Sequence, residues 1–182
     1  IDDLAVYIPQ LYLPLEGEFS RRREIDPGKL TRGIGIERMA IPDAHEDAAT
    51  MAAMSLLELM RRCDLLPEDI GKIHVGTESA VDEAKAIGTY VIGMLEKVYG
   101  PGSFQHCSTV EFKSACIGTT LALESISYWV AADEGERVGV VIASDVAKYP
   151  LGSSGEYTQG AGSVSLLVKK NPRIAALEQI YG

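Results

Sequence analysis

The sequence predicts an α/β layer fold, and three observations support this prediction. Short apolar or β-branched runs alternate with longer amphipathic stretches along the 182 residues, as strands and helices do when they alternate in a chain. Residues 138–144 are almost continuously apolar, as expected for a strand that is covered on both faces of a sheet. Hydrophobic residues make up 46% and charged residues 24% of the chain, a composition typical of a globular domain or of one large lobe.

The first third of the chain contains one expected strand, a long connection and one expected helix. The strand is residues 4–8, which are apolar and partly β-branched. Residues 10–41 are rich in charge and glycine, and a connection of that length should hold short elements or a function of its own. Asp43 and Glu46 have the spacing of a capping box, which predicts a helix over about residues 44–63.

The remaining elements are expected to alternate between strand and helix. In chain order, the pattern predicts a strand at 73–76, a helix at about 84–99, a strand at 109–112, a helix at 116–132, and strands at 138–144, 162–168 and 174–180. The glycines and proline of residues 100–102 end the second helix.

Charge and cysteine content exclude several classes of protein. The net charge of −9 argues against nucleic acid as a partner, although the basic residues between 21 and 32 could still bind an anionic ligand. The apolar runs are too short to span a membrane, and Asp2 stands where a signal peptide would be basic. Cys63, Cys107 and Cys116 form no CxxC pair, which argues against a disulfide framework and against a metal site. A cytoplasmic protein is expected.

Cys116 is the first candidate for chemistry. It follows an expected strand and a tight turn, and it begins the expected apolar helix at 116–132. Free backbone amides and the positive end of the dipole at a helix start favour a thiolate, and they can also hold an oxyanion. The alternative is a buried structural cysteine, which position alone does not exclude.

Glu78 is the second candidate, because it stands just beyond the strand at 73–76 and before small residues. Ligands gather outside the carboxyl ends of strands, and a partly buried glutamate there could act as a general acid or base. A helix N-cap or an ordinary surface carboxylate is the alternative. Because Glu78 and Cys116 each follow a different strand, both can reach the same edge of one sheet.

A loop rich in glycine and hydroxyl groups, residues 145–162, separates the last apolar strands. It could line a pocket or only connect the strands, and it contains neither a P-loop nor the GxGxxG dinucleotide motif. His45, in the first turn of the first expected helix, His74, in a strand, and His106, in a loop, are all interpreted as structural.

These segments together resemble the 3-hydroxy-3-methylglutaryl-CoA synthase family, in the form found in archaea and some bacteria. The matching segments are Asp26-Pro27-Gly28-Lys29, Gly33-Ile34-Gly35, Glu46-Asp47, Thr77-Glu78-Ser79-Ala80-Val81-Asp82, Lys113-Ser114-Ala115-Cys116, Asp145-x-Ala147-x-Tyr149 and Thr158-Gln159-Gly160-Ala161-Gly162. The resemblance covers essentially the whole chain. Tyr157 stands where the family usually has proline, which concerns the geometry of that loop and not the chemistry.

For the fold, the resemblance implies one half of a thiolase-like fold, a layered α/β structure with a mixed five-stranded sheet and a buried helix that starts at the nucleophilic cysteine. Residues 1–182 would be the amino-terminal half. The carboxy-terminal half, which carries the family's catalytic histidine, is absent from this chain and would be a partner. Residues 109–112 would lie near the interface of a homodimer, and the chain by itself would expose an apolar face.

For function, the resemblance implies an acyltransferase that condenses acetyl-CoA with acetoacetyl-CoA and water in the mevalonate route to isoprenoids. Cys116 would accept the acetyl group, and Glu78 would remove its methyl proton and later protonate the new hydroxyl. No tightly bound cofactor is implied. The positions that match the family's contacts are Asp26, Pro27 and Lys29 for coenzyme A, and Ser153 and Thr158 for the bound acyl group.

Two other functions stay open at this point. One is a condensing enzyme similar to a type III ketoacyl synthase, which also has a cysteine at the start of a buried helix. That group has no catalytic glutamate at the position of Glu78, so Glu78 favours the hydroxymethylglutaryl-CoA synthase family. The other is a non-catalytic thiolase-fold half that acts as a scaffold.

Overall fold

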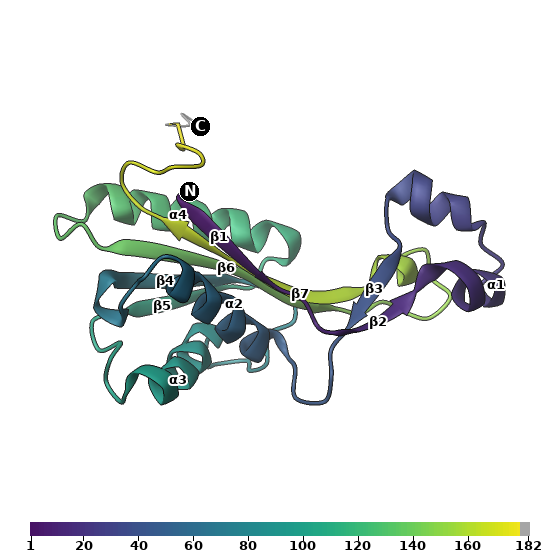
Figure 1. Cartoon of the computed structure of the whole chain (residues 1–182), viewed down its shortest axis with the longest axis horizontal. Helices are drawn as coiled ribbons and strands as arrows, with labels where there is room; N and C mark the ends of the chain where they lie inside the picture. The colour runs from purple at the N-terminus through teal and green to yellow at the C-terminus, as the bar shows by residue number, and fades with distance from the viewer. Residues whose placement is uncertain (179–182) are drawn as a thin grey trace.

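The computed structural model describes residues 1–178 and shows a layered α/β body with an extension at one end (Figure 1). The body contains a five-stranded sheet in the order β1-β7-β6-β4-β5. Its strands are β1 (Asp3–Tyr7), β4 (Ile70–Gly76), β5 (Ser108–Phe112), β6 (Val138–Ala147) and β7 (Gly160–Val168). β4 runs parallel to both β5 and β6, whereas β7 is antiparallel to β6 and to β1. The sheet is therefore mixed, as predicted.

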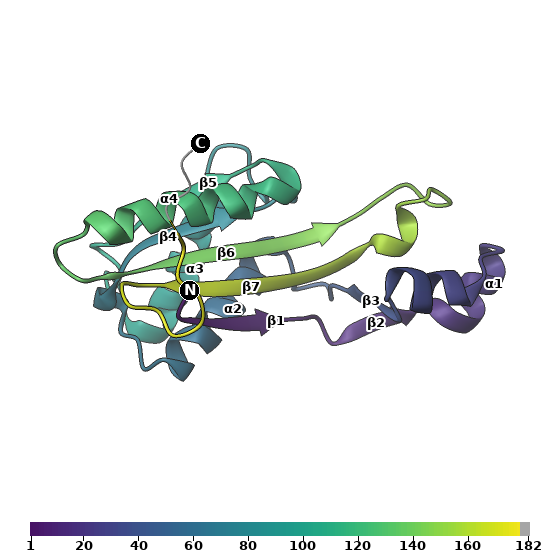
Figure 2. The ribbon, with the colours of Figure 1, turned by 90° about the horizontal axis from the view of Figure 1, so that it is seen from above.

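Helices cover both faces of the sheet (Figure 2). α4 (Gly118–Ala132) packs on one face, and α2 (Ala48–Arg62) and α3 (Ile87–Tyr99) pack on the other. Alternate residues of β6 supply both cores, because Val140 and Ile142 join the α2–α3 side and Val141 joins the α4 side. Burial on both faces explains the continuous apolar run at 138–144. No helix within residues 1–178 is long and apolar enough to cross a lipid bilayer.

α2 begins later than predicted, because Asp47 and not Asp43 is its N-cap. The Asp47 carboxylate accepts a hydrogen bond from the Thr50 amide at 2.7 Å, and the Thr50 hydroxyl accepts one from the Asp47 amide at 2.8 Å. Asp43 and Glu46 form a separate turn, in which the Asp43 amide donates to the Glu46 carboxylate at 2.7 Å. His45 therefore lies in this turn and not in a helix.

α3 also begins later than predicted, at Ile87 instead of about residue 84. The Asp82 carboxylate accepts hydrogen bonds from the amides of Ala84 and Lys85 at 2.8 and 2.9 Å. These hydrogen bonds hold residues 82–85 in a turn that precedes the helix. The sequence pattern predicts that residues 84 and 85 belong to the helix itself.

The long connection at 10–41 has short elements of its own, as predicted. β2 (Leu11–Pro14) and β3 (Arg38–Ile41) pair as an antiparallel ribbon, and α1 (Ser20–Arg22) lies between them at the far end of the extension (Figure 1). Irregular helical turns complete the assignment at Leu15–Phe19, Lys29–Ile34, Pro67–Asp69, Ala115–Ile117 and Glu156–Thr158. A small apolar core of the extension contains Leu15, Phe19, Leu30 and Met39.

The strand predicted at 174–180 is wrong for residues 174–178, and its last two residues lie outside the described part of the chain. Residues 174–178 instead run beside the amino terminus without joining the sheet. The amides of Ile174 and Ala175 both donate to the Ile1 carbonyl at 3.1 Å, and the Ile1 ammonium donates to the Ala175 carbonyl at 2.6 Å.

Part of the sheet exposes an apolar face. The register pairs Leu4 with Leu166 and Val6 with Val164, so both β1 side chains lie on the face that carries α4. Leu4 is 38% and Val6 is 48% exposed. An apolar face of the kind predicted from the sequence is therefore present in the described residues.

Candidate active site

Cys116 lies in a single 3-10 turn, Ala115–Ile117, between β5 and α4. The expectation that Cys116 itself starts the α-helix is wrong by two residues, because α4 begins at Gly118. The side chain is exposed, which excludes the reading of a buried structural cysteine. Cys116 therefore stands beside the first turn of α4, where backbone amides lack partners within the helix.

α4 begins in direct contact with the ends of β4 and β5. A Cβ atom at Gly76 would lie 2.3 Å from the Thr119 nitrogen, and one at Gly118 would lie 2.6 Å from the Phe112 carbonyl oxygen. Only glycine permits so close an approach of helix and strand backbones. The contact fixes the turn that bears Cys116 at the carboxyl edge of the sheet.

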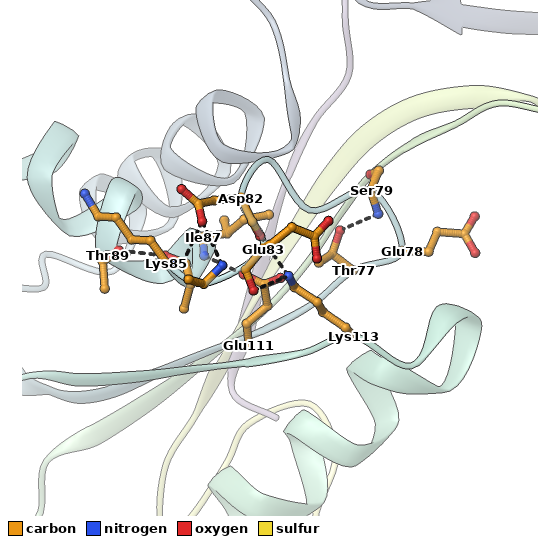
Figure 3. A network of polar contacts seen from close by, with 12 residues as sticks. Thr77, Glu78, Ser79, Asp82, Glu83, Lys85, Ile87, Thr89, Glu111 and Lys113 are labelled. Atoms are coloured by element: carbon orange, nitrogen blue, oxygen red, sulfur yellow. Dashed lines mark hydrogen bonds and ion pairs between the residues drawn. The ribbon is translucent and has the colours of Figure 1, made fainter.

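Glu78 follows β4, the strand next to the one that leads to Cys116. The two strands are parallel, with Gly76 opposite Phe112, and the Thr77 amide donates to the Phe112 carbonyl at 3.2 Å. The carboxyl ends of both strands thus lie together, as predicted. The Glu78 side chain is exposed to solvent and not partly buried as expected. It points away from the polar contacts of its own loop (Figure 3).

Asp145, near the end of β6, holds the loop of Glu78 in place. Its Oδ1 accepts hydrogen bonds from the Thr77 hydroxyl at 2.8 Å, the Glu78 amide at 2.7 Å, and the Ser79 amide and hydroxyl at 3.2 and 2.9 Å. The Ser79 hydroxyl also accepts from the Val146 amide at 2.8 Å. Sequence reasoning placed Asp145 in a motif but gave it no role. The available signal was an acidic residue directly after the apolar run of β6.

A pocket of about 480 Å³ lies between the connection 10–41 and the loop that joins β6 to β7. Its lining residues are Arg22, Arg23, Glu24, Ile25, Lys29, Gly152, Ser153, Ser154, Glu156 and Tyr157. The structure therefore brings Lys29 and Ser153 to one pocket. Asp26, Pro27 and Thr158 do not line it, although each is close in sequence to a residue that does.

An ion pair joins the two walls of this pocket. The Arg23 guanidinium donates to the Glu156 carboxylate through Nε at 2.8 Å and Nη2 at 2.6 Å, and the Gly152 amide donates to it at 2.6 Å. Arg23, followed by this amide, holds the pKa of the Glu156 carboxyl below its usual range. Because Arg23 neutralises Glu156, the charge of Lys29, whose Nζ lies 5.7 Å from the Tyr157 ring centroid, is available to an anion.

The candidate residues lie in two parts of the molecule. Glu78, whose amide binds Asp145, and Cys116, which follows β5, stand at the sheet edge and do not line the pocket. β6 and β7 extend toward the connection 10–41 (Figure 2). The pocket is lined by residues of that connection and of the loop between β6 and β7. Of the seven predicted site residues, Cys116 and Glu78 thus lie at the sheet edge, and Lys29 and Ser153 line the pocket.

The histidines take no part in this arrangement. His74 is 3% exposed within β4, as expected of a core residue, and burial lowers its pKa. His106 lies in the turn before β5. Within residues 1–178, no three or more His, Cys, Asp or Glu side chains are grouped so that they could hold a metal ion.

Comparison with known proteins adds a family and a set of relatives. A family model described as "Hydroxymethylglutaryl-coenzyme A synthase N terminal" matches residues 1–173. The hydroxymethylglutaryl-CoA synthase of Haloferax volcanii is 42% identical over 100% of this chain and 41% of its own length. That of Enterococcus faecalis is 37% identical over 98% of this chain and 44% of its own length.

Solved structures agree with these relatives. MvaS in complex with 3-hydroxy-3-methylglutaryl coenzyme A superposes with a TM-score of 0.84 and 36% identity, over 94% of this chain and 40% of that one. An HMG-CoA synthase complexed with CoA superposes with a TM-score of 0.80 and 34% identity, over 95% of this chain and 42% of that one. The chain therefore spans about two fifths of the length of the relatives that it matches.

Proposed function

Because the chain belongs to the hydroxymethylglutaryl-CoA synthase family, we propose that it supplies the amino-terminal part of a synthase that condenses acetyl-CoA with acetoacetyl-CoA and water. The products are 3-hydroxy-3-methylglutaryl-CoA and coenzyme A. The observation that carries this proposal is the placement of Cys116 and Glu78 at the adjoining carboxyl ends of the parallel strands β5 and β4. A nucleophile and a carboxylate at one sheet edge are the two groups that the chemistry requires.

In the first step, the Cys116 thiolate attacks the thioester carbonyl of acetyl-CoA. The tetrahedral oxyanion collapses, coenzyme A leaves as its thiol after taking up a proton, and an acetyl thioester remains on Cys116. Exposure of the thiol and its place before α4 support this role, because free amides at a helix start stabilise both a thiolate and an oxyanion.

In the second step, the Glu78 carboxylate removes a methyl proton from the acetyl group. The resulting carbanion attacks the ketone carbon of acetoacetyl-CoA, and Glu78 returns a proton to the new alkoxide. Water then hydrolyses the thioester and frees Cys116. The hydrogen bonds from Thr77, Glu78 and Ser79 to Asp145 support this role, since they fix the backbone on which the carboxylate is carried.

Coenzyme A thioesters are proposed to lie along β6 and β7, with the nucleotide end in the pocket that Lys29 lines. Asp26 and Pro27 stand beside this wall and would contact coenzyme A, and Ser153 and Thr158 would lie toward the acyl chain. Lys29 offers positive charge of the kind that the phosphates require. No tightly bound cofactor is needed for this reaction.

The remaining assignments concern the whole protein. We propose that a carboxy-terminal part completes the site and supplies its catalytic histidine. The assembled enzyme is proposed to be a cytoplasmic homodimer that serves the mevalonate pathway. The length of the relatives, more than twice that of this chain, supports a further part.

The test separates the two half-reactions in the full-length protein. Radiolabelled acetyl-CoA reports the acetyl group on Cys116, and mass spectrometry reports 3-hydroxy-3-methylglutaryl-CoA. We expect Cys116→Ala to lose both signals. Glu78→Gln should keep the acetyl label and lower product formation by about 10²- to 10⁴-fold, the usual contribution of a general acid–base group.

Cys107→Ala is the matched control. Burial raises the pKa of the Cys107 thiol to about 12, so this cysteine holds no thiolate at neutral pH and its loss should change neither signal. An acetyl label that persists in Cys116→Ala, or normal condensation by Glu78→Gln, would contradict the proposed roles.

A further inference from the structure

The loop of residues 77–86, which carries Glu78, is held at two places. Asp145 binds its beginning, as described above. Its second half is bound by a separate group of polar side chains, which the proposed mechanism does not use (Figure 3). This second group connects the loop to the segment that carries Cys116.

Lys113 makes the connection. Its Nζ donates to the Asp82 carbonyl at 2.7 Å and to the Glu83 carbonyl at 3.4 Å. Lys113 stands three positions before Cys116, at the point where β5 leaves the sheet. One ammonium group therefore joins the loop of the proposed base to the turn of the proposed nucleophile.

Glu111 sets the position of this ammonium group. Its side chain is only 4% exposed, and one carboxylate oxygen accepts from the amide of Ile87, the first residue of α3, at 2.6 Å. The other oxygen is buried without a hydrogen bond and lies 3.7 Å from the Lys113 Nζ. A buried carboxylate requires a compensating charge, so Glu111 attracts Lys113 toward the loop.

Asp82 closes the loop on its other side. Its carboxylate accepts from the amides of Lys85 and Ala84 and from the Tyr90 hydroxyl of α3, and these bonds hold its pKa at about 2. The second half of the loop is thus a closed turn that is anchored on α3. Lys113 joins this half of the loop to the segment that carries Cys116.

We infer that Lys113, oriented by Glu111, is a positioning residue that holds the Glu78 loop in register with the Cys116 turn. The inference rests on the proposed function. Acetyl transfer needs Cys116 and the donor thioester, whereas condensation also needs Glu78 over the acetyl group. Loss of Lys113 should therefore impair the second half-reaction selectively, because small misplacements of a reacting group cost up to about 10²-fold in rate.

The experiment uses the full-length protein and measures both half-reactions separately. Lys113→Met keeps an unbranched apolar side chain but removes the terminal ammonium group and its charge. We expect the rate of Cys116 acetylation to change by less than about 3-fold. Preacetylated Lys113→Met, mixed with acetoacetyl-CoA, should condense about 10- to 100-fold more slowly, with KM for acetoacetyl-CoA within about 3-fold of wild type.

Three further variants make the result specific. Lys113→Arg should restore condensation to within about 5-fold, because it returns the donor charge. In Glu111→Gln the side chain can still accept the hydrogen bond from the Ile87 amide, but the charge that orients Lys113 is removed. This variant should therefore show the same selective loss of condensation. It tests the inference if Lys113→Met does not fold. Lys85→Met is the control, because Lys85 lies on the same loop as Glu78. Its ammonium lies 4.1 Å from the ring centroid of Tyr90 in α3, and not against the segment that carries Cys116.

An equal fall in both half-reactions, or unchanged condensation in folded Lys113→Met, would overturn this inference while the proposed function stands. Wild-type protein that fails to acetylate Cys116 would overturn the proposed function and this inference with it. A loss in Lys85→Met as large as that in Lys113→Met would also overturn it.

Discussion

Arg23 and Glu156 show how one buried carboxylate can fix a pocket whose walls are 133 positions apart in the chain. Glu156 is 4% exposed, and all the bonds that it accepts come from the opposite wall or from its own loop. A buried anion is tolerated only when it is paired and hydrogen-bonded. The ion pair therefore stabilises the contact between the connection 10–41 and the loop after β6.

Replacing Arg23 should lower the stability of the protein, because Glu156 would remain buried without its cation. We expect Arg23→Met to lower the free energy of unfolding by about 2 kcal/mol, less than for a fully buried pair because Arg23 is one-third exposed. Arg23→Lys should recover only part, since lysine cannot bind both oxygens. Arg21→Met, whose side chain is 74% exposed, is the control and should change stability by less than about 1 kcal/mol in urea unfolding.

The effect of Arg23→Met should depend on pH in a defined direction. The pKa of folded Glu156 lies below that of an unfolded glutamate, about 4.3. The pair therefore contributes fully above pH 4.3, and its contribution is lost as pH falls through the lower pKa of the folded state. Wild type and Arg23→Met should differ less near pH 3 than at pH 7. An equal difference at both pH values would show that the charge is not the cause.

Single residues also mark how far the sequence could predict the site. Cys116 and Glu78 could be placed at one sheet edge, because each follows an apolar run that predicts a strand. The supporting roles of Asp145, Glu111 and Lys113 could not, since they depend on the strand order β6-β4-β5. No periodicity in the chain encodes which strands are neighbours.

At the scale of elements, the contact between β4 and α4 determines where the nucleophile turn lies. The backbone of Gly76 approaches the first turn of α4 so closely that no side chain fits between them. The turn Ala115–Ile117 has little freedom, because it links this fixed helix start to the end of β5.

A methyl group at Gly76 should force the helix away from the sheet. We expect Gly76→Ala to destabilise the protein by about 1–3 kcal/mol, the usual range for overpacking, and to slow alkylation or acetylation of Cys116 as the turn moves. Gly93→Ala is the matched control. A Cβ at Gly93 would meet no atom within 4 Å, and it lies within α3, so alanine should be neutral or stabilising by up to about 1 kcal/mol. Equal effects of both substitutions would contradict the role of the close contact.

The boundaries of elements show why some predictions were wrong. Asp43 with Glu46 and Asp47 with Thr50 both have the polar spacing of a helix start, and only packing decides that the second pair is the cap. The strand predicted at 174–180 failed over its described part for another reason. β7 is already paired with β6 on one side and with β1 on the other, so residues 174–178 cannot pair beside it. The amides of Ile174 and Ala175 bind the Ile1 carbonyl instead.

At the scale of the whole molecule, the two faces of the sheet differ. Helices α2 and α3 bury one face across its width, whereas α4 packs on the other over β4, β5, β6 and part of β7 and leaves Leu4 and Val6 of β1 exposed. Adjoining apolar side chains on a sheet face are typical of a surface that another element covers. The length of the relatives is consistent with such an element.

A polypeptide limited to residues 1–182 should therefore self-associate through this face. We expect sedimentation velocity to show oligomers that grow with concentration, and Val6→Lys to shift the protein toward monomer. Met54→Lys is the control, because Met54 is 46% exposed, close to the 48% of Val6, but lies on α2 over the opposite face. An equal shift by both variants would show that general solubility, and not this face, controls association.

The pairing of β1 with β7 also sets an order in time. Asp3 pairs with Leu167, so the first strand leaves the ribosome without a partner until about 160 more residues have been made. At about 5–20 residues per second, this interval is roughly 8–30 s. The loop that carries Ser153 and Glu156 is translated just before β7. The arrival of β7 therefore completes the sheet and closes the pocket almost together.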